Sequence, residues 1–68
     1  MMEMKPLNSS NLKAVGFDDG TLIIEFTNNT KYSYKNVPRH VYDELLAAPS
    51  HGKFFHAHIR NVYEVTKL

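Results

Sequence analysis

Two tyrosines at the centre of the chain, Tyr32 and Tyr34, are spaced so that both rings would lie on one face of a β-strand. Aromatic rings on a sheet surface can stack on unpaired bases, so this pair is a candidate nucleic-acid contact. The alternative interpretation is structural, because the core of so short a chain needs the apolar area of both rings.

Five basic side chains are candidate phosphate contacts. Two of them lie on the opposite face of the strand that carries the tyrosines, and three fall in predicted helices. These residues are Lys31, Lys35, Arg39, Lys53 and Arg60. Lys53 is near a predicted helix start, where free N–H groups favour phosphate. Alternatively, all five are ordinary solubilising charges interleaved with carboxylates such as Asp43 and Glu44.

The histidines lack the spacing of a metal site. His56 and His58 are two positions apart and His51 and His56 are five apart, whereas two ligands on one helix face are typically four apart. The chain also has no cysteine. We therefore predict no metal and no cofactor, and we interpret the histidines as surface groups.

The acidic residues do not suggest catalysis. Asp18 and Asp19 fit a turn, and Asp43 and Glu44 fit the solvent side of a helix. A chain of 68 residues also has little room for a pocket of ~300 Å³. We therefore predict that the protein is not an enzyme.

The composition predicts one small cytoplasmic domain. Eight Lys and Arg against seven Asp and Glu give a net charge of +1, which excludes a strongly basic arm, and 43% hydrophobic residues suffice for a core. No apolar run approaches the ~20 residues that cross a bilayer, so no membrane partner is expected. We expect a single domain over residues 10–68 after a flexible leader, residues 1–9.

Three segments have the alternating pattern of antiparallel strands: Leu12–Asp18, Thr21–Thr27 and Lys31–Lys35. Asp19-Gly20 is the favoured pair for a two-residue type I′ turn, which would place Phe17 opposite Leu22. A three-residue loop over 28–30 would place Phe26 opposite Tyr32 and Ile24 opposite Tyr34. These registers gather the apolar side chains on one face.

After residue 35 the apolar period changes to that of a helix. Val37-Pro38 begins the first predicted helix, and Pro49 ends it. Ser50 would cap a second helix that extends to about Val62, with Phe55, Ile59 and Val62 on its inner face. Residues 64–68 are either a short strand or a tail. The predicted fold is α+β, a three-stranded antiparallel meander followed by two α-helices packed on one face (β-β-β-α-α).

The ordered motifs resemble the KTSC domain, a short module named for the C-terminus of some lysyl-tRNA synthetases and also found as a stand-alone protein. Val15-Gly16-Phe17-Asp18 is similar to its V-G-Y-D motif, Leu22–Phe26 to its L-x-V-x-F strand, and Tyr32-Ser33-Tyr34 to its central Y-x-Y motif.

The resemblance continues through the helical half. The segment from Val37 to Leu45 is similar to V-P-x-x-V-Y-x-x-L, and the segment from Ala48 to Phe55 is similar to A-x-S-x-G-x-Y/F-F. The match spans roughly Ser10 to Tyr63. The resemblance implies a tRNA-synthetase context, in which RNA binding has been suggested, and it implies no catalytic activity.

Two functions remain open from the sequence. The first is a non-catalytic RNA-binding module with a tRNA-like partner, which uses the basic residues on phosphate and Tyr32 or Tyr34 on bases. The alternative is a protein-interaction or self-association module, suggested by Ile23 on the outer sheet face and by open sheet edges.

Overall fold

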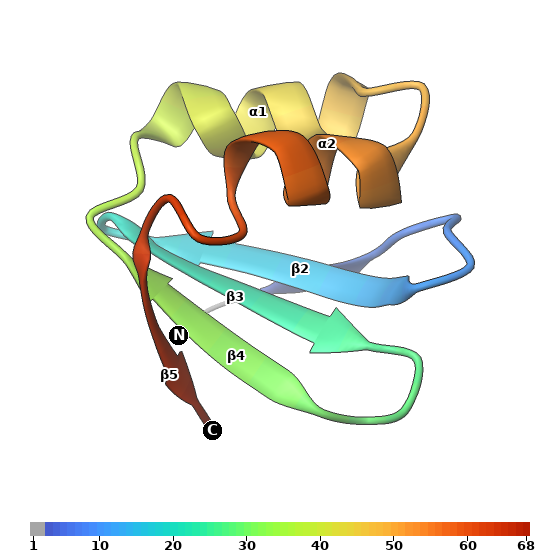
Figure 1. Cartoon of the computed structure of the whole chain (residues 1–68), viewed down its shortest axis with the longest axis horizontal. Coiled ribbons are helices and arrows are strands. Elements are labelled where there is room, and N and C mark those ends of the chain that lie inside the picture. Colours follow the sequence, from blue (N-terminus) through green and yellow to red (C-terminus); the bar gives the residue numbers. More distant parts are fainter. Residues whose placement is uncertain (1–2) are drawn as a thin grey trace.

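A computed structural model describes residues 3–68, which form a five-stranded antiparallel sheet with two helices above one face (Figure 1). The strands follow each other across the sheet in chain order. The elements are β1 (Met4–Pro6), β2 (Leu12–Asp18), β3 (Thr21–Phe26), β4 (Lys31–Lys35), α1 (Arg39–Ala47), α2 (His51–His58) and β5 (Glu64–Lys67). The predicted α+β class and the two helices on one face are confirmed.

The predicted number of strands is wrong, because a short strand is added at each edge of the meander. β1 lies within the segment expected to be a leader and pairs with β2, with Met4 opposite Gly16. β5 pairs with β4, with Val65 opposite Tyr34, which settles the open choice for residues 64–68. Such short strands show little periodicity, and they form because a neighbouring strand supplies hydrogen-bond partners. Residues 1 and 2 of the expected leader lie outside the described residues.

The first hairpin has the predicted register. Phe17 is opposite Leu22, and Asp18 is opposite Thr21. Asp19 and Gly20 both have positive φ, 48° and 81°, as a type I′ turn requires.

The second hairpin is shifted by two residues from the predicted register. Ile24, rather than Phe26, is opposite Tyr32, and Leu22 is opposite Tyr34. The loop comprises residues 27–29, since the Phe26 amide donates to the Thr30 carbonyl at 2.8 Å. Asn29 has φ of 68°, the left-handed conformation that closes a three-residue hairpin loop. Because the shift is even, every side chain stays on its predicted face.

The second helix is shorter than predicted. Ser50 caps α2 as expected, and its hydroxyl accepts a hydrogen bond from the Lys53 amide at 3.3 Å. The helix ends at His58 instead of Val62, and Asn61 beyond it has a left-handed φ of 64°. Val62 is therefore 58% exposed, and its predicted place on the inner face is wrong.

The core fills the space between the sheet and the helices. Fully buried aliphatic side chains come from both layers, and partly buried aromatic rings surround them. The largest fully buried side chains are Leu12, Leu22, Ile24, Leu45, Ile59, Val15 and Val37. On the outer face of the sheet Ile23 is half-buried, and Ser33 beside it is 8% exposed.

Candidate functional site

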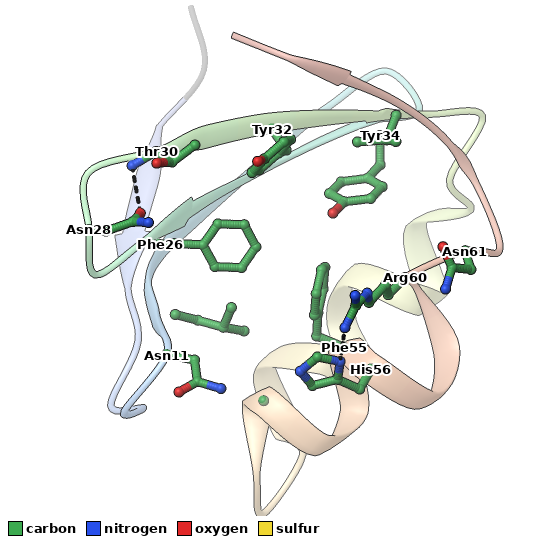
Figure 2. Close-up of a pocket in the computed structure, with 13 residues that line it drawn as sticks. Asn11, Phe26, Asn28, Thr30, Tyr32, Tyr34, Phe55, His56, Arg60 and Asn61 are labelled. Atoms are coloured by element: carbon green, nitrogen blue, oxygen red, sulfur yellow. Dashed lines mark hydrogen bonds between the residues drawn. The ribbon is translucent and has the colours of Figure 1, made fainter.

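The fold brings together three of the side chains singled out in the sequence. Tyr32 and Tyr34 project from β4 toward the helices, and Arg60 faces them from the turn after α2 (Figure 2). They share a hollow of about 430 Å³, which we call the aromatic groove. Its lining consists of Asn11, Leu12, Phe26, Asn28, Thr30, Tyr32, Tyr34, Gly52, Phe55, His56, Arg60, Asn61 and Val65.

The size of this groove contradicts the expectation that so short a chain has little room for a pocket. The early end of α2 at His58 leaves part of the helix-facing side of β4 and β5 uncovered. Val65, which lines the groove from β5, is accordingly 50% exposed.

Aromatic rings form the floor of the groove. The Phe26 ring meets Tyr32 edge to face at 5.5 Å between centroids and meets Phe55 at 5.6 Å. Tyr34 meets Phe55 at 5.7 Å, again edge to face. This geometry is the preferred one for neighbouring rings and holds the floor in a fixed shape.

Tyr34 belongs to both the core and the groove. Its side chain is 5% exposed, so the ring has no free face for a ligand. Burial raises the pKa of the Tyr34 phenol above its ordinary value of 10.0, the neighbouring Tyr32 raises the pKa further, and Arg60 lowers it. The hydroxyl therefore stays protonated at neutral pH and can donate a hydrogen bond. Of the two tyrosines, Tyr32 is the one with ring surface left for a base, because it is only half-buried.

The wall formed by α2 and the turn that follows it carries the positive charge of the groove. Arg60 and His56 are exposed, and the Arg60 guanidinium lies 3.3 Å from His56 Nδ1. The lining contains no Asp or Glu. An anion that enters the groove therefore meets a guanidinium and no opposing carboxylate.

The opposite rim is the β3–β4 turn. The Asn28 side chain accepts a hydrogen bond from the Thr30 amide at 3.0 Å, which fixes the turn. Asn11 lies below this rim, and Asn61 lies beyond Arg60 (Figure 2). These asparagines could not be predicted as site residues from the sequence, because each belongs to an irregular segment whose position depends on the tertiary fold.

Lys67 is a further basic residue near the tyrosines that the sequence analysis did not single out. It lies directly opposite Tyr32 in the β4–β5 ladder, and directly opposed residues point to the same face. The sequence left β5 open as a strand or a tail, so the face of Lys67 could not be predicted.

The remaining candidate lysines and arginine lie apart from the groove. Lys31 and Lys35 are on the outer sheet face, where Lys31 is opposite Glu25 and Lys35 is opposite Glu64. This face carries both signs of charge.

Arg39 and Lys53 occupy separate places on the helices. Arg39 is paired with Asp43 at 3.3 Å and lies over the Tyr42 ring at 5.6 Å. Lys53 lines a shallow hollow at the start of α2, with Phe54 and His58. The predicted basic residues therefore do not form one continuous patch.

Within residues 3–68, no group of three or more His, Cys, Asp or Glu side chains is placed to hold a metal ion. No helix in the same range has the length and apolar character needed to cross a membrane.

These features define a small α+β domain with a five-stranded meander and an aromatic groove beside its second helix. Residues 8–63 match the model of the KTSC domain, and the chain belongs to this family. The resemblance seen in the sequence is confirmed.

Relatives occur both as single domains and as parts of larger proteins. A protein of Tsukamurella paurometabola is 36% identical over 67 residues, which cover 96% of this chain and all of that protein. The lysine–tRNA ligases of Trichormus variabilis and of a Nostoc species are 40% identical over 48 residues, 71% of this chain but 9% of each ligase. The crystal structure of a KTSC domain protein from Yersinia pestis aligns with a TM-score of 0.96 at 30% identity, covering 100% of this chain and 99% of that one.

Proposed function

We propose that this protein is a small, non-catalytic cytoplasmic module that binds RNA through the aromatic groove. The observation that carries the proposal is the meeting of Tyr32, Tyr34 and Arg60 in one hollow without a carboxylate. Aromatic faces next to a guanidinium match the two parts of a nucleotide, its base and its phosphate. The similarity to a segment of two lysine–tRNA ligases supports an RNA partner of the tRNA type.

A titration of the ¹⁵N-labelled chain with tRNA and with short single-stranded RNA tests this function. At low salt we expect amide shifts at the groove-lining residues of β4 and of the helical segment, which are Tyr32, Tyr34, Phe55, His56 and Arg60. The apparent affinity should fall with salt by about 0.7 log units per log unit of salt for each phosphate contacted. RNA that moves none of these amides would refute the function.

A second candidate function is self-association through the free edge of β5. The exposed large hydrophobic residues found in residues 3–68 are Val62, Val65 and Leu68, all at or beside this edge. The Leu68 amide donates to the Lys31 carbonyl at 2.9 Å, so by the alternation of an antiparallel ladder Val65 and Lys67 direct their backbone groups outward. A second copy could pair with these groups and cover the apolar side chains.

Sedimentation velocity over a range of protein concentrations tests this second candidate. We expect a monomer–dimer equilibrium that Leu68→Glu shifts toward monomer. The substitution removes an apolar side chain from the interface, and the new carboxylate would repel the same carboxylate of the second copy. A single monomeric species at every concentration would reject it. RNA binding by such a monomer would leave the first proposal intact.

A further inference from the structure

The floor of the aromatic groove has two rings that remain open to a ligand. Phe26 and Tyr32 are half-buried, whereas Phe55 and Tyr34 are 4% and 5% exposed. Phe26 and Tyr32 meet at an interplanar angle of 68°, so neither ring stacks on the other. They are the surfaces of the groove against which a flat ring can pack.

A hydrogen-bond donor points into the same space. The Tyr34 hydroxyl is directed into the groove (Figure 2) and donates to no other group within residues 3–68. Every fully buried side-chain polar atom in that range has a hydrogen-bond partner. Since the Tyr34 hydroxyl oxygen has none, it is not fully buried and is open to the groove. A side chain that is 95% buried therefore offers an unused donor beside the open rings.

The positive charge lies to one side of these rings. Arg60 lies in the turn after α2, and its guanidinium is 3.3 Å from Nδ1 of His56. Lys67, on the neighbouring strand β5, lies on the same face of the sheet as Tyr32. A ring on Phe26 and Tyr32 would thus have a cation within reach of an attached phosphate.

We propose that the aromatic groove binds one unpaired nucleotide of RNA, with its base against Phe26 and Tyr32, its base edge at the Tyr34 hydroxyl and its phosphate at Arg60. This inference rests on the proposed RNA-binding function and specifies which form of RNA is bound.

The shape of the site distinguishes an unpaired nucleotide from a duplex. The open rings are recessed between the β3–β4 turn and α2, in a hollow of about 430 Å³. Bases stacked within a duplex cannot reach them, and a duplex offers mainly its phosphates and 2′-hydroxyl groups. The other candidate basic residues are dispersed, and Lys31 and Lys35 are opposite carboxylates. Within residues 3–68, these basic side chains therefore do not form the continuous surface that a duplex would need.

Ligand competition on the full chain tests the inference. The probes are AMP, UMP, adenosine, inorganic phosphate, a single-stranded RNA of about eight nucleotides and a perfect duplex of the same sequence. We expect the single strand to bind at least about tenfold more tightly than the duplex. A mononucleotide should displace it and shift the amides of Phe26, Tyr32 and Arg60. The affinity of the single strand should depend only weakly on salt, by about 0.7 to 1.4 log units per log unit of salt, because one or two phosphates are contacted.

Two conservative variants separate the proposed contacts. Tyr34→Phe keeps the buried ring and removes the hydroxyl, and it should weaken single-strand binding about three- to tenfold, the range of one neutral hydrogen bond. Arg60→Gln should weaken binding and lower the salt dependence by about 0.7. Tyr42→Phe and Lys35→Gln are the matched controls, because both side chains lie outside the groove, and they should leave the affinity unchanged.

The outcomes separate this inference from the proposed function. Equal binding of single strand and duplex, with shifts still at the groove, would overturn the unpaired-nucleotide site and leave the proposed function in place. Shifts confined to the outer sheet face would refute both. Inorganic phosphate that binds as tightly as AMP would show that the rings contribute nothing, which also overturns it. An absence of binding by any RNA would refute both.

Discussion

At the scale of single residues, Tyr34 performs two tasks that a sequence pattern cannot separate. Its ring is part of the buried core, and its hydroxyl faces the aromatic groove. The spacing of the Y-x-Y motif correctly indicated a shared face with Tyr32, because the side-chain period of a strand is two. The different exposure of the two rings depends on Phe55, which packs against Tyr34 from α2.

The buried phenol predicts a loss of stability at alkaline pH. Because burial first, and Tyr32 second, raise the pKa of Tyr34 above 10.0, the folded chain holds this proton more tightly than the unfolded chain. The free energy of unfolding should therefore be constant, with respect to this group, below pH 10, and it should fall as pH rises from about 10 through the folded pKa.

Urea unfolding at several pH values between neutrality and strong alkali measures this fall. Tyr34→Phe should reduce it, whereas Tyr63→Phe, a change at a more exposed tyrosine, serves as the control. An unchanged alkaline slope in Tyr34→Phe would contradict the assignment.

At the scale of elements, the boundaries of α2 decide the shape of the site. Ser50 fixes its beginning through the Lys53 amide, and its end at His58 exposes the groove. The cap could be predicted because Ser is a strong N-cap residue next to a proline. The end could not, since Ile59 and Val62 continue the apolar spacing, and only the left-handed Asn61 shows that the chain turns away.

Removal of the α2 cap should destabilise the protein modestly. Ser50→Ala leaves the Lys53 amide without its acceptor and should lower the free energy of unfolding by about 1 kcal/mol. Chemical denaturation measures the change. Ser10→Ala is a suitable control, because the Ser10 hydroxyl is bonded only to the side chain of its neighbour Asn11 among the described residues. Equal losses in the two variants would show that Ser50 does not act as a cap.

In the strands, too, the features that depend on a few neighbouring residues could be predicted, and those that depend on the tertiary fold could not. The Asp19-Gly20 turn could be read from two residues, because both must adopt positive φ. The second turn contains several residues that suit a loop, and its position was set by Asn29 taking the left-handed conformation. The faces of the strands followed from alternation alone, whereas β1 and β5 are too short to show it.

At the scale of the whole molecule, the small core limits the tolerance to substitution. A domain of 68 residues is expected to have a free energy of unfolding of about 3–10 kcal/mol. The apolar contact between the two layers is concentrated in a few side chains that are fully buried, such as Ile59 and Leu45. The shape of the site therefore depends on a core whose free energy of unfolding is small.

Truncation of one such side chain should unfold a large share of the population. Ile59→Ala should cost about 2–5 kcal/mol, because it removes apolar contact and leaves a cavity between α2 and the sheet. Thermal unfolding followed by circular dichroism measures the loss. Val62→Ala is the control, since Val62 is 58% exposed and its truncation should change stability by less than about 0.5 kcal/mol. A large loss at Val62 would show that α2 continues to that residue.

The loop over residues 27–29 forms a rim of the aromatic groove and joins β3 to β4. Because the side-chain period of a strand is two, a change of two residues in the register of these strands keeps every side chain on its face. Insertions or deletions of two residues at this bend would raise or lower one lip of the hollow and keep the interior of the domain as it is. Relatives could thereby differ in the depth of the hollow, and so in the size of what fits there, while sharing one scaffold.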